Sequence, residues 1–104
     1  MMNAAQLEET SEKEVATWLR HNEYSAIQLR YDDPQVIDLE ASKDGVRYLI
    51  RVKTAVHPAV PPSPPPVELQ ALKAKAADER RVVILAKVRL DANGAVLSMA
   101  WEKP

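Results

Sequence analysis

One tight turn constrains the fold of this chain more than any other feature of its sequence. Asp44-Gly45 lies between two runs of alternating apolar and polar residues, in the stretch VIDLEASKDGVRYLIRVKTA over residues 36–55. An Asp-Gly pair in this setting is the strongest short-range signal for a two-residue β-hairpin. Because a two-residue loop fixes the register of its strands, we expect Asp38 to lie opposite Arg51, on one charged face of the sheet.

The remaining elements follow from periodicity and turn signals. Ser11 and Glu14 form a capping-box pattern, so residues 1–10 are expected to be a frayed start and residues 12–21 a helix. Residues 32–34 read as a break, and residues 57–66, which hold six of the eight prolines, read as an extended loop. The further predicted elements are strands at 24–31, 82–86 and 95–101 and a helix at 67–77.

These elements predict one α+β domain over residues 11–104, in the order αβββαβ with one more strand. The uninterrupted apolar run at 82–86 is typical of a strand buried on both faces, next to the hairpin. We therefore expect a mixed sheet of four to five strands flanked by two helices.

Composition excludes several functional classes. The chain has no cysteine, which excludes disulfides and thiolate-bound zinc, and only two glycines, which excludes a glycine-rich phosphate loop. No long apolar run is present, so we expect a cytoplasmic protein without a membrane partner or a small-molecule cofactor. The formal charge of −1 means that any nucleic-acid binding needs a local basic patch.

A motif within the hairpin resembles the PD-(D/E)XK nuclease superfamily, which has the restriction-endonuclease-like fold, and most closely its Holliday junction resolvase and Mrr-like branch. The pattern D-L-x-A-x-x-x-G-x-x-x-x-I-x-x-K is carried by Asp38, Leu39, Ala41, Gly45, Ile50 and Lys53. The segment from Glu12 to Val15 is similar to the E-R-E-L segment of the first helix in those resolvases. The resemblance covers about residues 11–86 and includes the element order.

The resemblance implies a metal-dependent nuclease site. Glu12 and Asp38 would bind Mg²⁺ or Mn²⁺, and Lys53 would act with Asp38 in catalysis by orienting water or stabilising phosphate charge. The position that should be the acidic (D/E)xK ligand is Arg51. A guanidinium cannot bind a metal, so an ion pair between Arg51 and Asp38 could replace the cation.

Two alternatives stay open at this point. Glu40 lies two residues from Asp38, hence on the same predicted face, and could supply the missing metal ligand. Each candidate also has a simpler interpretation: a helix-dipole contact for Glu12, a cross-strand salt bridge for Asp38 and Arg51, and a solvated charge for Lys53 or Glu40.

Three functional hypotheses follow. The first is a nuclease-fold protein with a degenerate metal site and weak or no catalysis, which binds nucleic acid, more readily DNA than RNA, through Arg51 and Lys53. The second is an active Mg²⁺- or Mn²⁺-dependent DNA endonuclease, which requires Glu12, Asp38 and Glu40 to converge. The third is a non-enzymatic interaction domain, in which Glu12 faces solvent and residues 82–86 lie away from the hairpin. The resemblance also implies a homodimer.

Overall fold

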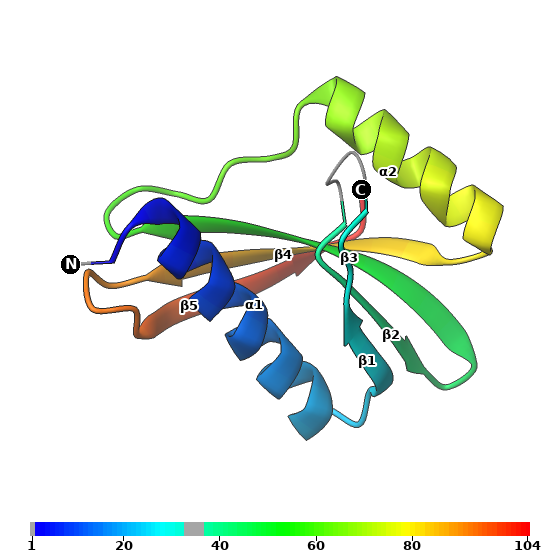
Figure 1. The fold of residues 1–104 in the computed structure, drawn as a ribbon, viewed down its shortest axis with the longest axis horizontal. Helices are drawn as coiled ribbons and strands as arrows, with labels where there is room; N and C mark the ends of the chain where they lie inside the picture. Colours follow the sequence, from blue (N-terminus) through cyan, green and yellow to red (C-terminus); the bar gives the residue numbers. More distant parts are fainter. Residues whose placement is uncertain (1, 33–36) are drawn as a thin grey trace.

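The computed structural model describes residues 2–32 and 37–104 of the chain. In sequence order, its elements are α1 (Ala4–His21), β1 (Ser25–Leu29), β2 (Leu39–Lys43), β3 (Val46–Val56), α2 (Pro66–Glu79), β4 (Val82–Leu90) and β5 (Val96–Glu102) (Figure 1). Within the described residues the strands form one sheet in the order β1-β2-β3-β4-β5, in which only β3 and β4 pair in parallel. The predicted α+β class, with a mixed sheet and two helices, is confirmed.

The hairpin forms as predicted. Asp44 and Gly45 adopt positive φ angles of 51° and 80°, as a tight turn with left-handed residues at both central positions requires. Pairs from Leu39 with Ile50 to Lys43 with Val46 have the predicted register. The predicted break at 33–34 and the predicted start of the hairpin at Val36 lie outside the described residues.

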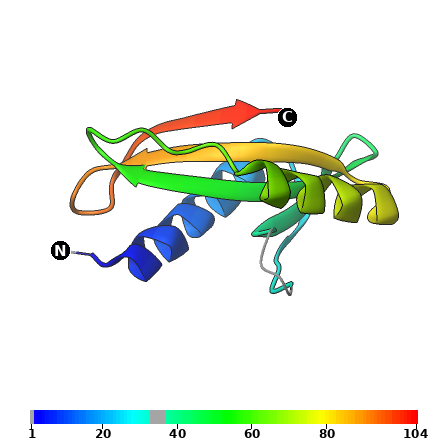
Figure 2. The same cartoon turned by 90° about the horizontal axis from the view of Figure 1, so that it is seen from above.

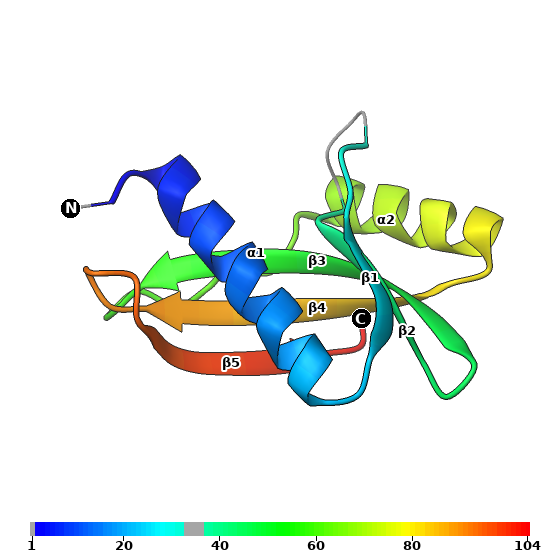
Figure 3. The same cartoon turned by 60° about the horizontal axis from the view of Figure 1, so that its bottom comes forward.

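The two helices cover opposite faces of the sheet. Neighbouring residues of β3 show this alternation, because Ile50 belongs to the core that contains Val15 of α1 and Leu49 to the core that contains Leu72 of α2. Figure 2 shows the sheet from its edge, and Figure 3 shows α1 lying diagonally across one face with α2 behind the sheet. The sheet therefore has a hydrophobic core on each face, one covered by α1 and the other by α2.

The first helix begins at Ala4, so the prediction of a frayed segment over residues 1–10 is wrong for residues 4–10. Asn3 caps the helix: its side chain accepts from the backbone N of Gln6 (2.9 Å), and the Gln6 side chain accepts from the backbone N of Asn3 (2.9 Å). This reciprocal pair satisfies the first free amides of the helix eight residues before the capping pattern at Ser11. Ser11 is instead fully buried within the helix, and the added turns bring Glu8 onto the same side as Glu12.

Of the two strands after α2, β4 is four residues longer than predicted, and β5 has the predicted length but begins one residue later. β4 continues past Ala86 to Leu90, because Val88 and Leu90 are fully buried and keep the alternation. β5 lies at an edge of the sheet and exposes Leu97; a homodimer that uses this strand stays a prediction. No helix in the described residues has the length and apolar character needed to cross a membrane.

Candidate functional site

A pocket of about 410 Å³ lies where the sheet opens between α1 and the proline-rich loop. It brings together four of the residues singled out from the sequence: Glu12, Asp38, Arg51 and Lys53. The other lining residues are Glu8, Arg30, Tyr31, Val52, Thr54 and Pro62. The pocket therefore gathers residues from α1, from the end of β1 and from the hairpin.

Asp38 is the buried acidic residue of this pocket. It precedes the first residue of β2, and it is only 8% exposed. Its Oδ2 accepts a hydrogen bond from the backbone N of Val52 (2.7 Å), and its Oδ1 lies 3.2 Å from Nη1 of Arg51. The contact between Asp38 and Arg51 expected from the hairpin is present, and a backbone amide holds the carboxylate in place.

Arg51 joins Asp38 to a second carboxylate. Its Nη2 donates to Oε1 of Glu68 at 2.6 Å, and Nζ of Lys53 lies 2.9 Å from Oε2 of the same glutamate. We refer to Asp38, Arg51, Lys53 and Glu68 as the Arg51 cluster. Within this cluster the guanidinium lies between two carboxylates, as a bound cation would.

Sequence reasoning missed Glu68. It lies in the first turn of α2, immediately after the proline-rich loop. Acidic residues are common in the first turn of a helix because they interact favourably with the helix dipole, so this position alone does not indicate a site. Burial alone would raise the pKa of Glu68, but the Lys53 ammonium and the Arg51 guanidinium outweigh it and hold the pKa below its ordinary value. Only the path of the loop shows that this carboxylate returns to Arg51.

Glu12 contacts the other side of Asp38. Burial, followed by the Asp38 carboxylate and the charge of Glu8, raises the pKa of Glu12 from 4.5 to about 7, while Arg51 acts in the opposite direction. Below pH 7 the Glu12 carboxyl therefore keeps its proton and can share it with Asp38. Glu12 points into the pocket, as the resemblance implies for the acid of the first helix.

Glu40 is not brought to this group. Its Oε2 accepts from Nη2 of Arg81 at 2.6 Å, and its Oε1 lies 3.9 Å from Arg30. The alternation that would place Glu40 beside Asp38 does not hold, since the backbone N of Asp38 donates to the carbonyl oxygen of Ile50 (2.9 Å), the residue that also pairs with Leu39. Such a one-residue slip turns successive side chains to the other face.

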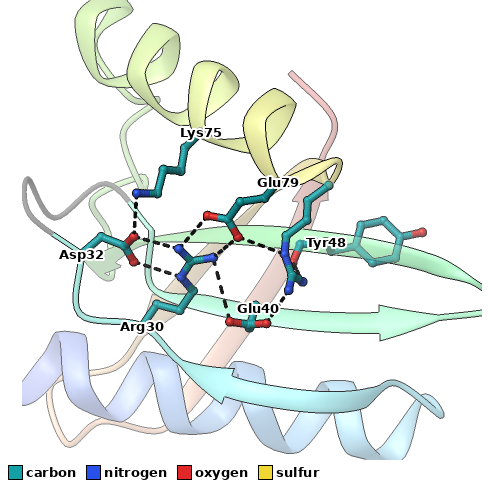
Figure 4. Close-up of polar contacts among 7 residues, drawn as sticks. Arg30, Asp32, Glu40, Tyr48, Lys75 and Glu79 are labelled. Carbon is teal, nitrogen blue, oxygen red and sulfur yellow. Dashed lines mark hydrogen bonds and ion pairs between the residues drawn. The ribbon is translucent and has the colours of Figure 1, made fainter.

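Glu40 belongs instead to a second group of charges, at the C-terminal end of α2 (Figure 4). We refer to this group as the Arg30 cluster; its members are Arg30, Asp32, Glu40, Lys75, Glu79 and Arg81. Arg30 makes two hydrogen bonds each to Asp32 and Glu79, at 2.7–3.0 Å. Hydrogen bonds from Arg30 hold the pKa of both carboxylates below the ordinary value.

The residues of the pocket do not fit the divalent cation that the resemblance implies. Asp38 and Glu68 would offer hard oxygen ligands, but the Arg51 guanidinium already bridges them. Over residues 2–32 and 37–104, no three acidic or histidine side chains form a group that could hold a metal ion. The Arg51 guanidinium thus occupies the place of a cation between Asp38 and Glu68, and the pocket lining combines three cationic with three acidic side chains.

The sequence matches no protein-family model and is not significantly similar to any curated protein.

Proposed function

We propose that this domain is a nuclease-fold protein of the PD-(D/E)XK type that binds nucleic-acid phosphate without metal-dependent cleavage. Arg51 and Lys53 contact the phosphate, and Asp38 positions Arg51. DNA is the expected partner, bound through its backbone and therefore with little dependence on sequence.

The architecture supports the fold assignment. The elements α1, β1, β2, β3, α2 and β4 follow the order αβββαβ that the resemblance implies. Glu12, Asp38 and Lys53 line one pocket, as the acidic residues and the lysine of that family should. This convergence joins α1 to the hairpin, two segments that the motif alone does not relate.

One observation carries the functional assignment. Arg51 stands at the position of the acidic (D/E)xK ligand, and its guanidinium makes ion pairs with Asp38 (3.2 Å) and Glu68 (2.6 Å). A guanidinium at this position needs no bound metal to place a positive charge between the two carboxylates. Arginine also suits phosphate, because its planar donors match two phosphate oxygens at once.

The geometry gives less support to the two alternatives. An active endonuclease that uses Glu40 needs this carboxylate near Asp38, but Glu40 makes its ion pairs with Arg81 and Arg30. An unrelated interaction domain predicts an outward-facing Glu12 and a distant β4. Instead Glu12 lines the pocket, and β4 pairs directly with β3.

The test is the binding of fluorescein-labelled linear and branched DNA, measured by anisotropy over a series of salt concentrations. We expect Arg51→Gln to weaken binding about tenfold and to reduce the slope of log K against log salt by about one, as the loss of one phosphate contact should. Arg47→Gln is the matched control, since Arg47 lies exposed on the same strand. Equal affinities for the two variants would remove Arg51 from the binding surface and contradict the proposal.

A further inference from the structure

Glu68 occupies the hydrogen-bonding positions on which phosphate binding would depend. It accepts from Nη2 of Arg51 at 2.6 Å and from Nζ of Lys53 at 3.2 Å, with the second carboxylate oxygen 2.9 Å from Lys53. The side chains of all three residues are 16% exposed. Both cations proposed to contact phosphate are therefore already bound to an anion that the chain itself supplies.

The charges of the Arg51 cluster match this arrangement. Asp38 and Glu68 balance Arg51 and Lys53, so the cluster is neutral with Glu68 in place. With Glu68 turned away, the three remaining residues carry a net charge of +1. A phosphodiester carries one negative charge, so it would restore the neutrality of the cluster once Glu68 has turned away. With Glu68 still in place, the same phosphodiester would leave the cluster with an excess negative charge.

The pocket also retains hydrogen-bond donors that Glu68 does not use. Among the described residues, Nε of Arg51 and Oγ1 of Thr54 are buried without a hydrogen-bond partner. Both residues line the pocket, whereas Glu68 is not among the lining residues and reaches the cations from α2. Buried donors without partners are costly, so a side-chain rearrangement that brings them to a phosphate in the pocket would be favourable.

We propose that Glu68 is an internal competitor for phosphate, which neutralises Arg51 and Lys53 in the free protein and is displaced when a phosphate group enters the pocket. This inference rests on the proposed function and adds its regulation. Glu68 lies in the first turn of α2, directly after the proline-rich loop, and displacement requires its carboxylate to rotate away from Arg51 and Lys53. The chemistry is shared by nucleic-acid backbone and free phosphate, and we assign the site to the backbone.

The test compares the wild-type protein with Glu68→Gln and with Glu14→Gln, an exposed substitution on α1 that changes the net charge equally. Binding of labelled DNA is measured by anisotropy. Binding of inorganic phosphate is measured from the backbone amide signals of Val52 and Lys53. We expect Glu68→Gln to raise both affinities about tenfold and Glu14→Gln to change them less than about twofold, because only the first removes a direct competitor.

The outcomes separate the inference from the proposed function. If DNA binding depends on Arg51 but Glu68→Gln behaves as Glu14→Gln does, the competition is wrong and the proposed function stands. If Glu68→Gln gains phosphate affinity while no variant binds DNA, the competition holds and the nucleic-acid assignment is wrong. If Glu68→Gln gains no phosphate affinity and neither the wild type nor any variant binds DNA, both are overturned.

A second variant keeps the competition testable if Glu68→Gln does not fold. Glutamine can still accept hydrogen bonds from Arg51 and Lys53, but Glu68→Gln could destabilise α2. Glu68→Asp keeps the charge and withdraws the carboxylate by one methylene, so it should raise phosphate affinity about threefold, between wild type and Glu68→Gln. A Glu68→Asp protein that is folded and has wild-type phosphate affinity would contradict the competition.

Discussion

Two ion clusters tie the sheet region to α2, one at each end of the helix, and they differ in how fully their hydrogen bonds are satisfied. In the Arg30 cluster, Arg30 makes four hydrogen bonds to Asp32 and Glu79, at 2.7–3.0 Å. In the Arg51 cluster, Arg51 has a buried Nε without a partner among the described residues, and a pocket lies beside it. The first arrangement is typical of a structural network, the second of a site that can accept a ligand.

The charge states of the two clusters differ in the same sense. Asp32 and Glu79 have pKa values below the ordinary value and stay ionised next to Arg30. At the Arg51 cluster, the neighbouring Glu12 has its pKa raised to about 7. The acids of the Arg30 cluster are therefore ionised beside their cation, whereas Glu12, next to the Arg51 cluster, changes its charge near neutral pH.

The largest expected effect is on stability. Arg30→Gln leaves Asp32, Glu40 and Glu79 without their shared cation, and we expect it to lower the free energy of unfolding by about 3 kcal/mol. Urea denaturation measures the loss, with the exposed Arg20→Gln as control.

Arg51→Gln should cost only about 1 kcal/mol in the same experiment, since Asp38 keeps its hydrogen bond from Val52 and a proton available from Glu12. Equal losses for Arg30→Gln and Arg51→Gln would abolish the distinction between a structural and a ligand-binding cluster.

The second prediction concerns a restored metal site. Arg51→Glu removes the cation that bridges Asp38 and Glu68 and adds a carboxylate, so it should bind Mn²⁺ with a Kd of about 0.1 mM, at least about 100-fold more tightly than the wild type. Calorimetry measures the binding, and Asp38→Ala in the Arg51→Glu background should abolish it. A folded Arg51→Glu protein that does not bind Mn²⁺ would show that these carboxylates do not converge as inferred.

The smallest effect concerns pH. Glu12 has a pKa of about 7 when folded against 4.5 ordinarily, because of burial, Asp38 and Glu8, with Arg51 opposing. Between these values the folded state holds more protons than the unfolded state, so stability falls as the pH rises from about 5 to 8.

Glu12→Gln mimics the protonated form and should flatten this profile, with a gain of about 1 kcal/mol at pH 8 after allowance for the partial exposure of Glu12. Thermal unfolding at pH 5, 6, 7 and 8 measures both profiles. An unchanged slope in Glu12→Gln would assign the pH dependence to another group.

The parts of this structure that could be predicted from the sequence are those that depend on residues close together in the chain. The turn at Asp44-Gly45 and the pairing of residues 39–43 with residues 46–50 follow from alternation and one turn type. Asp38 and Arg51 make the expected ion pair, although the predicted pairing of their backbones is replaced by a bulge. The start of α1 could not be separated from the competing signal at Ser11, because both Asn3 and Ser11 can cap a helix.

The missed parts depend on tertiary placement. Glu68 reaches Arg51 only because the proline-rich loop returns α2 to the sheet, and the path of that loop does not follow from the sequence pattern. Glu40 faces Arg81 because the strand pairing slips by one residue at Asp38, which alternation alone does not reveal.

The most direct test of the account is DNA binding by the wild-type protein in EDTA and, in parallel, in millimolar Mn²⁺. We predict affinities that agree within about twofold and intact DNA in both, because Arg51 rather than a metal provides the charge at the site. DNA binding or cleavage that appears only with Mn²⁺ would contradict the central claim and would identify the pocket as a working metal centre.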